Sequence, residues 1–451
     1  HHSQALGGWV KNGIRDSILI NFDAHDDMRW IAPEKIAELK KIHSAEDWQT
    51  FRKADSIKEQ GLYDVGSFIH AARNLGVVSK VYWVIPFPYL RSSNPKEAMN
   101  AFLKKYGFSQ KDIDTFTLER ARYEGTCCGT PVVICDIESL PDIKEPVLLS
   151  IDADFFPSYS AMHGKDMLSS ITLLHEKLAQ KKYAVRDATV SCSVDGGYLD
   201  VARRWIVRVC ERLLVQPDAL TEPYPDKWLV YNQADTYFYE NKARELNGLV
   251  RRFEKKYNED IPLRIYAAFW LIANGKEQEA FSTAEKIAGR DSRYAYLLAD
   301  LGQCLIDRGR LSAAVRFFDK AYRLKPEMNF RQKNLADAFF QAGEYEKAVY
   351  YYNIYRRKNG LFPAAFHLGL SERRMNHEEK AGLWFKKGLQ SVKNGKYTDI
   401  RGETDREAIK ESVEYFTEKG MHQEAAFIMR HPSFKKFFLN EITAGRYTGI
   451  R

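Results

Sequence analysis

Short apolar runs alternate with amphipathic stretches through the first half of the chain. The runs are rich in Val, Ile, Leu and aromatic residues, as expected of strands buried on both faces of a sheet. Between them, apolar residues recur at helical spacing. The pattern predicts strands at Ile18–Phe22, Lys80–Ile85, Pro131–Asp136, Val147–Ile151 and Ala188–Ser193, and helices at Ala32–Lys41, Val65–Leu75, Pro95–Tyr106 and Met167–Lys181. Alternating strands and helices indicate an α/β fold built on a parallel sheet.

The second half of the chain is helical and contains an internal repeat of 34 residues. The stretch "LLADLGQCLIDRGRLSAAVRFFDKAYRLKP" resembles the tetratricopeptide (TPR) pattern, with small residues where two helices cross. The resemblance implies an all-α solenoid of four to five helical pairs from Pro262 to Arg430. Three repeat positions carry it: Gly275, Gly309 and Gly343; Ala280, Ala314 and Ala348; and Ala284, Phe318 and Tyr352.

TPR arrays usually bind a peptide or protein in their concave groove, which makes such a partner the expectation for this chain. Tyr350, Tyr351 and Tyr352 are candidates to line the groove. Successive helix positions point in different directions, so at most one or two of the three can do so.

A stretch with three prolines, "VQPDALTEPYPDKW", is the predicted domain boundary. It gives a first domain at 1–225, a connecting helical segment at 226–260, a TPR domain at 261–430 and a C-terminal tail at 431–451.

Two of the apolar strands end abruptly in acidic residues and a histidine. A bare carboxylate at the end of a buried strand is costly unless a cation compensates it. Alternate residues on a strand point the same way, so side chains two apart can converge. With a histidine from the opening "HHSQALGG", the set suits two divalent ions, and its oxygen-rich mixture favours Mn2+ over a thiolate-type zinc site. Its members are His2, Asp23, His25, Asp27, Asp152 and Asp154.

The segments "HSQALG", "DAHDD" and "SIDADFF" resemble the metal-binding segments of the arginase (ureohydrolase) and deacetylase superfamily. The resemblance implies an arginase-like three-layer α/β/α fold and two Mn2+ ions per chain, with Zn2+ or Fe2+ as alternatives. One ion would be held by His2, Asp23, Asp27 and Asp152, and the other by Asp23, His25, Asp152 and Asp154. Asp23 and Asp152 would bridge, and Asp154 would accept a proton from the attacking water.

Within the superfamily, Tyr63–Ile69 and Val81–Pro86 resemble a branch that includes peptide arginases. Those enzymes hydrolyse a C–N bond to convert arginine to ornithine within peptides. The glutamate that holds the guanidinium in arginases has no counterpart in "ATVSCSVDGGY". Substrate-binding candidates are instead Arg29, Ser193 and Asp195, and general-acid candidates are His70 and His163.

Two alternatives stay open. A zinc-type deacetylase or amidohydrolase shares the Asp-x-His motif, but that class lacks counterparts of Asp27 and Asp152. The second alternative is a non-catalytic TPR scaffold.

Charge, hydropathy and cysteine spacing limit the classes of protein to which the chain can belong. The net charge of +8 over 451 residues is modest, and no nucleic-acid motif is visible. No apolar run is long enough to span a bilayer. The six cysteines lack CxxC spacing, which favours reduced thiols in a cytoplasmic protein, and the adjacent Cys127 and Cys128 lie in a predicted loop. The chain begins inside a motif, so a first strand is expected before His1.

Overall fold

The computed structural model describes residues 2–56, 61–194, 198–254, 256, 259–326, 331–359, 362–394, 403–431, 434 and 438. The chain divides into two compact units, His1–Lys276 and Glu277–Arg451. Within the described ranges, no helix combines the length and apolar character needed to cross a membrane.

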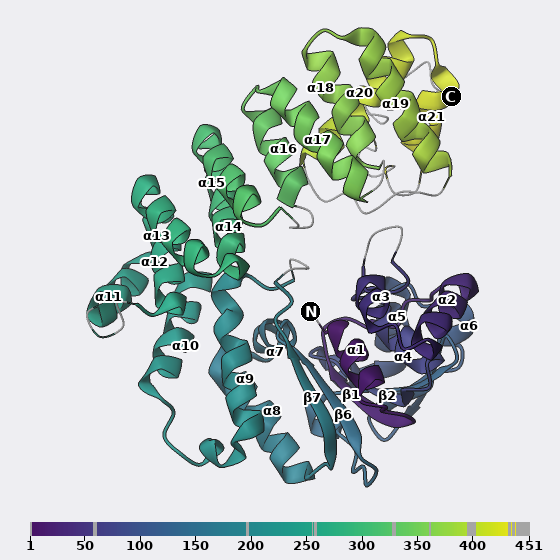
Figure 1. Ribbon diagram of the computed structural model, residues 1–451, viewed down its shortest axis with the longest axis vertical. Helices are drawn as coiled ribbons and strands as arrows, with labels where there is room; N and C mark the ends of the chain where they lie inside the picture. The colour runs from purple at the N-terminus through teal and green to yellow at the C-terminus, as the bar shows by residue number, and fades with distance from the viewer. Residues whose placement is uncertain are drawn as a thin grey trace. The chain divides into compact units, whose positions relative to one another are not determined.

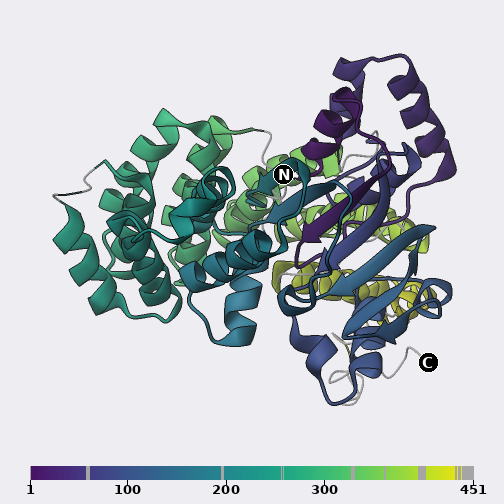
Figure 2. The same cartoon turned by 90° about the horizontal axis from the view of Figure 1, so that it is seen from below.

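The first unit is built on a seven-stranded sheet with the order β3-β4-β5-β2-β1-β6-β7 (Figures 1 and 2). Five strands are parallel, at the five predicted places: β1 (Ser17–Phe22), β2 (Val78–Val84), β5 (Thr130–Cys135), β6 (Val147–Asp152) and β7 (Val185–Ser191). An antiparallel hairpin of β3 (Thr117–Glu119) and β4 (Arg122–Cys127), which the sequence pattern did not predict, extends one edge. The α/β class is confirmed with a mixed sheet, and the arginase-like layering remains a prediction.

Helices pack around this sheet, with α4 against β2 and α9 against β7 (Figure 1). Asn94 caps α5 by accepting a hydrogen bond from the backbone N–H of Glu97. The helices of this unit are α1 (Gln4–Lys11), α2 (Pro33–Ser44), α3 (Trp48–Ala54), α4 (Phe68–Asn74), α5 (Pro95–Lys105), α6 (Gln110–Ile113), α7 (Phe155–His163), α8 (Met167–Lys181), α9 (Trp205–Val215), α10 (Asp226–Tyr239), α11 (Ala243–Glu254) and α12 (Ile261–Ala273).

The proline-rich segment 215–228 lies inside the first unit rather than between the two units. Helix α12, at the expected start of the repeats, packs against α10, α11 and the 3-10 helix η3 (Val201–Arg204). A buried ion pair helps to hold this region: Arg203 Nε lies 2.9 Å from Asp235 Oδ1, which also accepts a hydrogen bond from Tyr266 Oη at 3.0 Å. The segment from 226 to 276 therefore belongs to the first unit.

The second unit consists of helices that pack in consecutive pairs, α14 with α15, α16 with α17, α18 with α19, and α20 with α21 (Figure 1). This arrangement confirms the predicted helical repeat. The helices are α13 (Glu277–Arg290), α14 (Ala295–Ile306), α15 (Leu311–Leu324), α16 (Arg331–Gln341), α17 (Tyr345–Asn359), α18 (Ala364–Arg374), α19 (Glu378–Lys393), α20 (Glu403–Glu418) and α21 (His422–Arg430).

The repeating glycine has a structural reason. Gly309, Gly343 and Gly420 follow the first helix of their pairs with φ of +71°, +78° and +72°, the left-handed conformation that glycine adopts freely. In the copy without a glycine, Asn376 takes this conformation with φ of +62°. Asparagine tolerates it, which explains why that repeat departs from the pattern without losing the turn.

The repeat's apolar positions lie in the core, where Ala314, Ala348 and Phe318 are buried. Of the tyrosine run, Tyr352 is fully buried and donates a hydrogen bond to Asp337 Oδ1 at 2.6 Å. Tyr350 is 62% exposed, so it alone of the three points largely to solvent.

We expect Gly369→Ala to destabilise the second unit. A Cβ on Gly369 would lie 2.5 Å from the ring of Phe385, across the α18–α19 crossing. Overpacking of this kind costs about 1–3 kcal/mol. Thermal unfolding of the full chain followed by far-UV circular dichroism measures the change.

The matched control is Gly289→Ala in α13, because no described atom lies within 4 Å of its Cβ position. Removing an exposed helical glycine should leave stability unchanged or raise it by up to about 1 kcal/mol. Equal destabilisation by the two substitutions would contradict the close-packed crossing.

Candidate metal centre

The candidate site lies at the carboxyl ends of β1 and β6, two neighbouring parallel strands. Phe22 is in register with Ile151, so Asp23 and Asp152, one residue later on each strand, come out side by side. The chain leaves β1 for β2 on one side and later returns to β6 on the other. Ligands of open α/β sheets bind at such a reversal of strand order.

His2 is the centre of the first group of contacts. Its Nε2 lies 2.9 Å from Asp27 Oδ2, and its Nδ1 lies 2.7 Å from Asp152 Oδ2 and 3.6 Å from Asp23 Oδ2. All four side chains are buried. The segment before α1 thus brings an imidazole onto the ends of both strands, as the sequence predicted.

His25 forms the second group with Asp23 and Asp154. Its Nδ1 lies 3.1 Å from Asp154 Oδ2 and 3.5 Å from Asp23 Oδ1. The imidazole is partly exposed, with 34% of its side chain accessible, whereas both carboxylates are buried. This side of the cluster therefore opens to solvent.

Two overlapping sets of three ligand atoms result, and they share Asp23. Among the described residues, His2, Asp23 and Asp27 offer one set and Asp23, His25 and Asp154 the other, with the ligand atoms of each within 4.8 Å of one another. Asp152 lies in neither set and contacts His2 instead. Of the two residues expected to bridge, Asp23 is thus common to both sets, whereas Asp152 belongs to neither.

Several polar atoms of the cluster are buried without a well-aligned hydrogen bond among the described residues, although His2 Nε2 faces Asp27 Oδ2 at 2.9 Å and His25 Nδ1 faces Asp154 Oδ2 at 3.1 Å. These buried atoms are His2 Nε2, Asp23 Oδ2, Asp27 Oδ2 and both carboxylate oxygens of Asp154. Buried polar atoms nearly always form hydrogen bonds, so this group of poorly satisfied potential ligand atoms needs an explanation. Nitrogen and carboxylate oxygen are the ligands that divalent first-row cations take, and the residues present fit such ions.

The carboxylates disturb one another's ionisation. Burial, together with the charges of Asp152 and Asp23, raises the pKa of Asp154 to about 8. Burial and the charges of Asp27 and Asp152 likewise raise the pKa of Asp23 well above its ordinary value. In the absence of a cation, the cluster therefore holds protons at neutral pH.

The imidazoles respond to the same charges. Burial lowers the pKa of His25, but the hydrogen bonds and charges of Asp154 and Asp23 outweigh it and raise that pKa to about 11. Burial opposes the ionisation of Asp152 as well, yet His2 and a hydrogen bond from Ser193 hold its pKa below the ordinary value. His2 and Asp152 thus form a charged pair, while Asp154 stays protonated.

Residues outside the predicted ligand set hold the cluster in place. Ser193, at a positive φ of +46°, donates its hydroxyl to Asp152 Oδ2. The ring of Phe68 stacks on His2 at a centroid distance of 5.0 Å. Tyr198, half exposed, lies 4.4 Å from the ring of His25. Phe68 and Tyr198 lie in stretches that the sequence analysis quotes, Tyr63–Ile69 and "ATVSCSVDGGY", but neither was a candidate, because an aromatic side chain is not a typical metal ligand.

Within the described residues, Arg29, His70 and His163 have their polar partners outside the cluster. Arg29 pairs with Asp64 at 3.1 Å and donates to the carbonyl of Gly66. His70 Nδ1 accepts a hydrogen bond from the backbone N–H of Ile31. Asp195 lies outside the described residues.

His163 lies at the end of α7, where its ring stacks on Tyr159 and Nε2 lies 3.2 Å from the carbonyl oxygen of Pro86. Among described residues, neither His163 nor His70 forms a hydrogen bond or ion pair with the ligand candidates. Of the predicted substrate and acid residues, the structure thus connects only Ser193 to the cluster, as a support for Asp152.

No family model matches the chain, and no curated protein matches it. Several solved structures resemble part of it. The C-terminal part of a TPR repeat-containing protein from Cytophaga hutchinsonii is 15% identical, with 51% of this chain and 93% of that one covered and a TM-score of 0.36. YrrB, a TPR protein with an unusual peptide-binding site, is 16% identical (43% and 97% covered, TM-score 0.30), and MamA is 22% identical (39% and 95% covered, TM-score 0.28). The repeat assignment of this chain rests on its own helix pairs and turns.

Replacing Asp27 by Asn should lower the Mn2+ content of the loaded protein from two equivalents to about one. The substitution removes one carboxylate from the group around His2 and leaves the group around His25 intact. Elemental analysis after removal of excess metal measures the content.

Asp136→Asn is the matched control. Asp136 also follows a parallel strand of the sheet, but its carboxylate caps η2 (Ile137–Ser139) and pairs with Arg91 at 2.6 Å. Its loss should leave the metal content unchanged. A wild-type protein that retains no metal would contradict the site.

The metal-free protein should lose stability between about pH 6 and about pH 8.5. The pKa values of Asp154 and His25 are raised in the folded state, to about 8 and about 11. Groups with raised pKa values stabilise the fold at low pH, and that contribution disappears as pH rises through the folded-state value. Thermal melting of chelator-treated protein at both pH values measures the loss, and Mn2+ should reverse it.

Asp154→Asn should weaken this pH dependence, because the amide binds no proton and carries no charge. A melting temperature of the metal-free protein that does not change over this range, or an unchanged slope in the variant, would contradict the account.

Proposed function

We propose that the first unit is a binuclear, metal-dependent hydrolase of C–N bonds. The observation that carries the proposal is the convergence of two imidazoles and three buried carboxylates in two sets of ligand atoms that share Asp23, with a fourth buried carboxylate, Asp152, against His2. Divalent cations, with Mn2+ the best match to this oxygen-rich donor set, would supply Lewis-acid activation of water there.

The chain's own residues have separable tasks. Asp154 Oδ1 is buried without a hydrogen-bond partner among the described residues, so this carboxylate is the candidate to accept a proton from the attacking water. His2 and Ser193 fix Asp152 from two sides. Tyr198, beside His25 on the accessible side, is positioned to contact an entering substrate.

The substrate we propose is an arginine side chain within a peptide, following the resemblance to peptide arginases. In that reaction the water oxygen bonds to the guanidinium carbon, and the bond from this carbon to the side-chain nitrogen breaks. A proton goes to the departing nitrogen, so the products are ornithine and urea. The residue that delivers this proton is unassigned, since His70 and His163 are occupied elsewhere.

We assign the second unit a role in binding a peptide or protein. Its support is the run of helix pairs with a left-handed residue at the turn of each, the architecture of TPR arrays. YrrB, which resembles this chain, is a TPR protein with a peptide-binding site. Tyr350, largely exposed on α17, is a candidate contact residue.

A protein-binding scaffold without catalysis is the second candidate function. The helical repeat favours it, because that unit can bind a partner whatever the first unit does. The resemblances to solved TPR proteins agree with this candidate better than with the hydrolase, whose support is the metal-site geometry.

The deciding experiment incubates the Mn2+-loaded full chain with arginine-containing peptides and measures urea release together with a peptide mass change to ornithine. We expect turnover by the wild type and by Asp136→Asn, and a loss of at least about 100-fold in Asp154→Asn. Peptide binding without turnover by the wild type would leave the scaffold in its place, and equal turnover by Asp154→Asn would exclude this site as the source of activity.

A further inference from the structure

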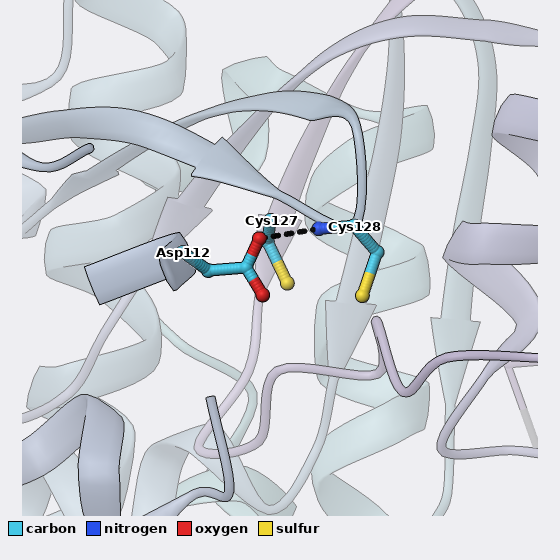
Figure 3. A group of neighbouring side chains, drawn as sticks. All are labelled: Asp112, Cys127 and Cys128. Atoms are coloured by element: carbon cyan, nitrogen blue, oxygen red, sulfur yellow. Dashed lines mark hydrogen bonds between the residues drawn. The ribbon is translucent and has the colours of Figure 1, made fainter. Parts of the chain in front are cut away.

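A second group of potential ligands, which shares no residue with the ligand set described above, lies at the β4–β5 hairpin. Asp112, Cys127 and Cys128 place a carboxylate oxygen and two Sγ atoms within 4.8 Å of one another (Figure 3). Cys127 is buried, whereas Cys128 and Asp112 are partly exposed. The group is therefore anchored in the core and accessible from solvent.

The backbone turn explains why neighbouring cysteines face the same way. Along a strand, adjacent side chains point to opposite faces. Here Cys127 pairs with Thr130, and the two residues between them, Cys128 and Gly129, have φ of +49° and +79°. This turn rotates Cys128 so that both sulfur atoms lie on one side of the hairpin (Figure 3).

Cysteine is an unusual choice for this position. Two-residue hairpin turns with positive φ favour Asn, Asp or Gly, and a side chain such as cysteine is strained there. Strained residues persist where the surrounding structure holds them, commonly at functional sites. The conformation is the one that places a second thiol next to the first.

Asp112 is held in position toward the thiols. Its Oδ1 accepts a hydrogen bond from the backbone N–H of Cys128 at 3.1 Å, and its Oδ2 accepts one from Ser109 Oγ at 2.6 Å. Ser109 also caps the short helix α6 that carries Asp112. Such outer hydrogen bonds orient ligating carboxylates in metal sites.

We propose that Asp112, Cys127 and Cys128 bind a thiophilic divalent cation, and that Zn2+ is the preferred ion. Two thiolates and a carboxylate are a soft donor set that favours Zn2+ over Mn2+. Ligand atoms in a tetrahedral zinc–thiolate site lie roughly 3.5–4 Å apart, so small side-chain rotations close this group around an ion. Because Cys128 and Asp112 are partly exposed, water would complete the coordination.

The thiols already share a proton in a way that a cation can replace. A hydrogen bond from the Cys127 thiol lowers the pKa of Cys128, and the same bond raises the pKa of Cys127. The sulfur ligands of this site would favour Zn2+, whereas the oxygen-rich ligands of the proposed hydrolase site would favour Mn2+.

Cobalt titration tests the proposal, because only cysteine ligands give a thiolate-to-Co2+ charge-transfer band. The reduced full chain should develop the band up to one equivalent, and Zn2+ should abolish it. Cys128→Ser, at the more exposed cysteine, should remove the band, whereas Cys304→Ser in α14 should keep it. Asp112→Asn retains an acceptor for the Cys128 N–H and should weaken Co2+ binding about 10–100-fold.

Asp154→Asn should leave the band intact, which separates this site from the proposed hydrolase centre. Absence of the band in folded, reduced wild-type protein would overturn the proposal. So would a band of undiminished strength in Cys128→Ser. Circular dichroism of each variant checks that it is folded.

Discussion

Four carboxylates are buried in one small volume of the first unit, with two imidazoles beside them. Burying like charges together is unfavourable, and two histidines cannot fully compensate for four acidic groups. When no cation is present, the raised pKa values of Asp154 and Asp23 mean that these carboxyl groups hold protons, which reduces the repulsion between them. Bound divalent cations would reduce this repulsion further, and the buried carboxylate oxygens of the cluster would be their ligands. The rest of the site depends on this excess of negative charge.

The sheet makes that concentration of charge achievable. β1 lies in the middle of the parallel strands, with β2 on one side and β6 on the other, so its carboxyl end is surrounded by protein. Hydrogen-bonded register fixes Asp23 beside Asp152 without help from flexible side chains. The segment before α1 then adds His2, whose imidazole reaches carboxylates from both strands. Segments distant in sequence thus converge on a rigid frame.

The sequence alone predicted the five parallel strands and the meeting of acidic residues at the ends of two of them, because a carboxylate directly after an apolar strand is conspicuous. It did not predict the β3–β4 hairpin, whose short, half-polar edge strands lack an apolar run. Arg29 and His70 were plausible by residue type, but their partners, Asp64 and the backbone of Ile31, depend on how distant loops fold back. Single polar residues outside a strand-end motif carry no such information, and so the substrate side of the site was not predictable.

In the second unit too, the sequence pattern predicts the local structure but not the packing partners of each helix. The 34-residue period revealed helix pairs and the glycine turn, and Asn376 shows why the pattern weakens where another residue can adopt positive φ. The period could not place α12, which repeats the sequence pattern yet packs against α10, α11 and η3. Local sequence specifies a helix and its turn, whereas its packing partners are chosen by the whole apolar surface that it meets.

The central claim is that two metal ions share Asp23. Electron paramagnetic resonance of the Mn2+-loaded protein tests this directly, because two manganese ions linked by a carboxylate interact magnetically and differ in spectrum from isolated ions. We predict the spectrum of a coupled pair in the wild type and that of a single ion in Asp27→Asn. A wild-type spectrum of isolated, uncoupled Mn2+ at full loading would contradict the shared-carboxylate centre.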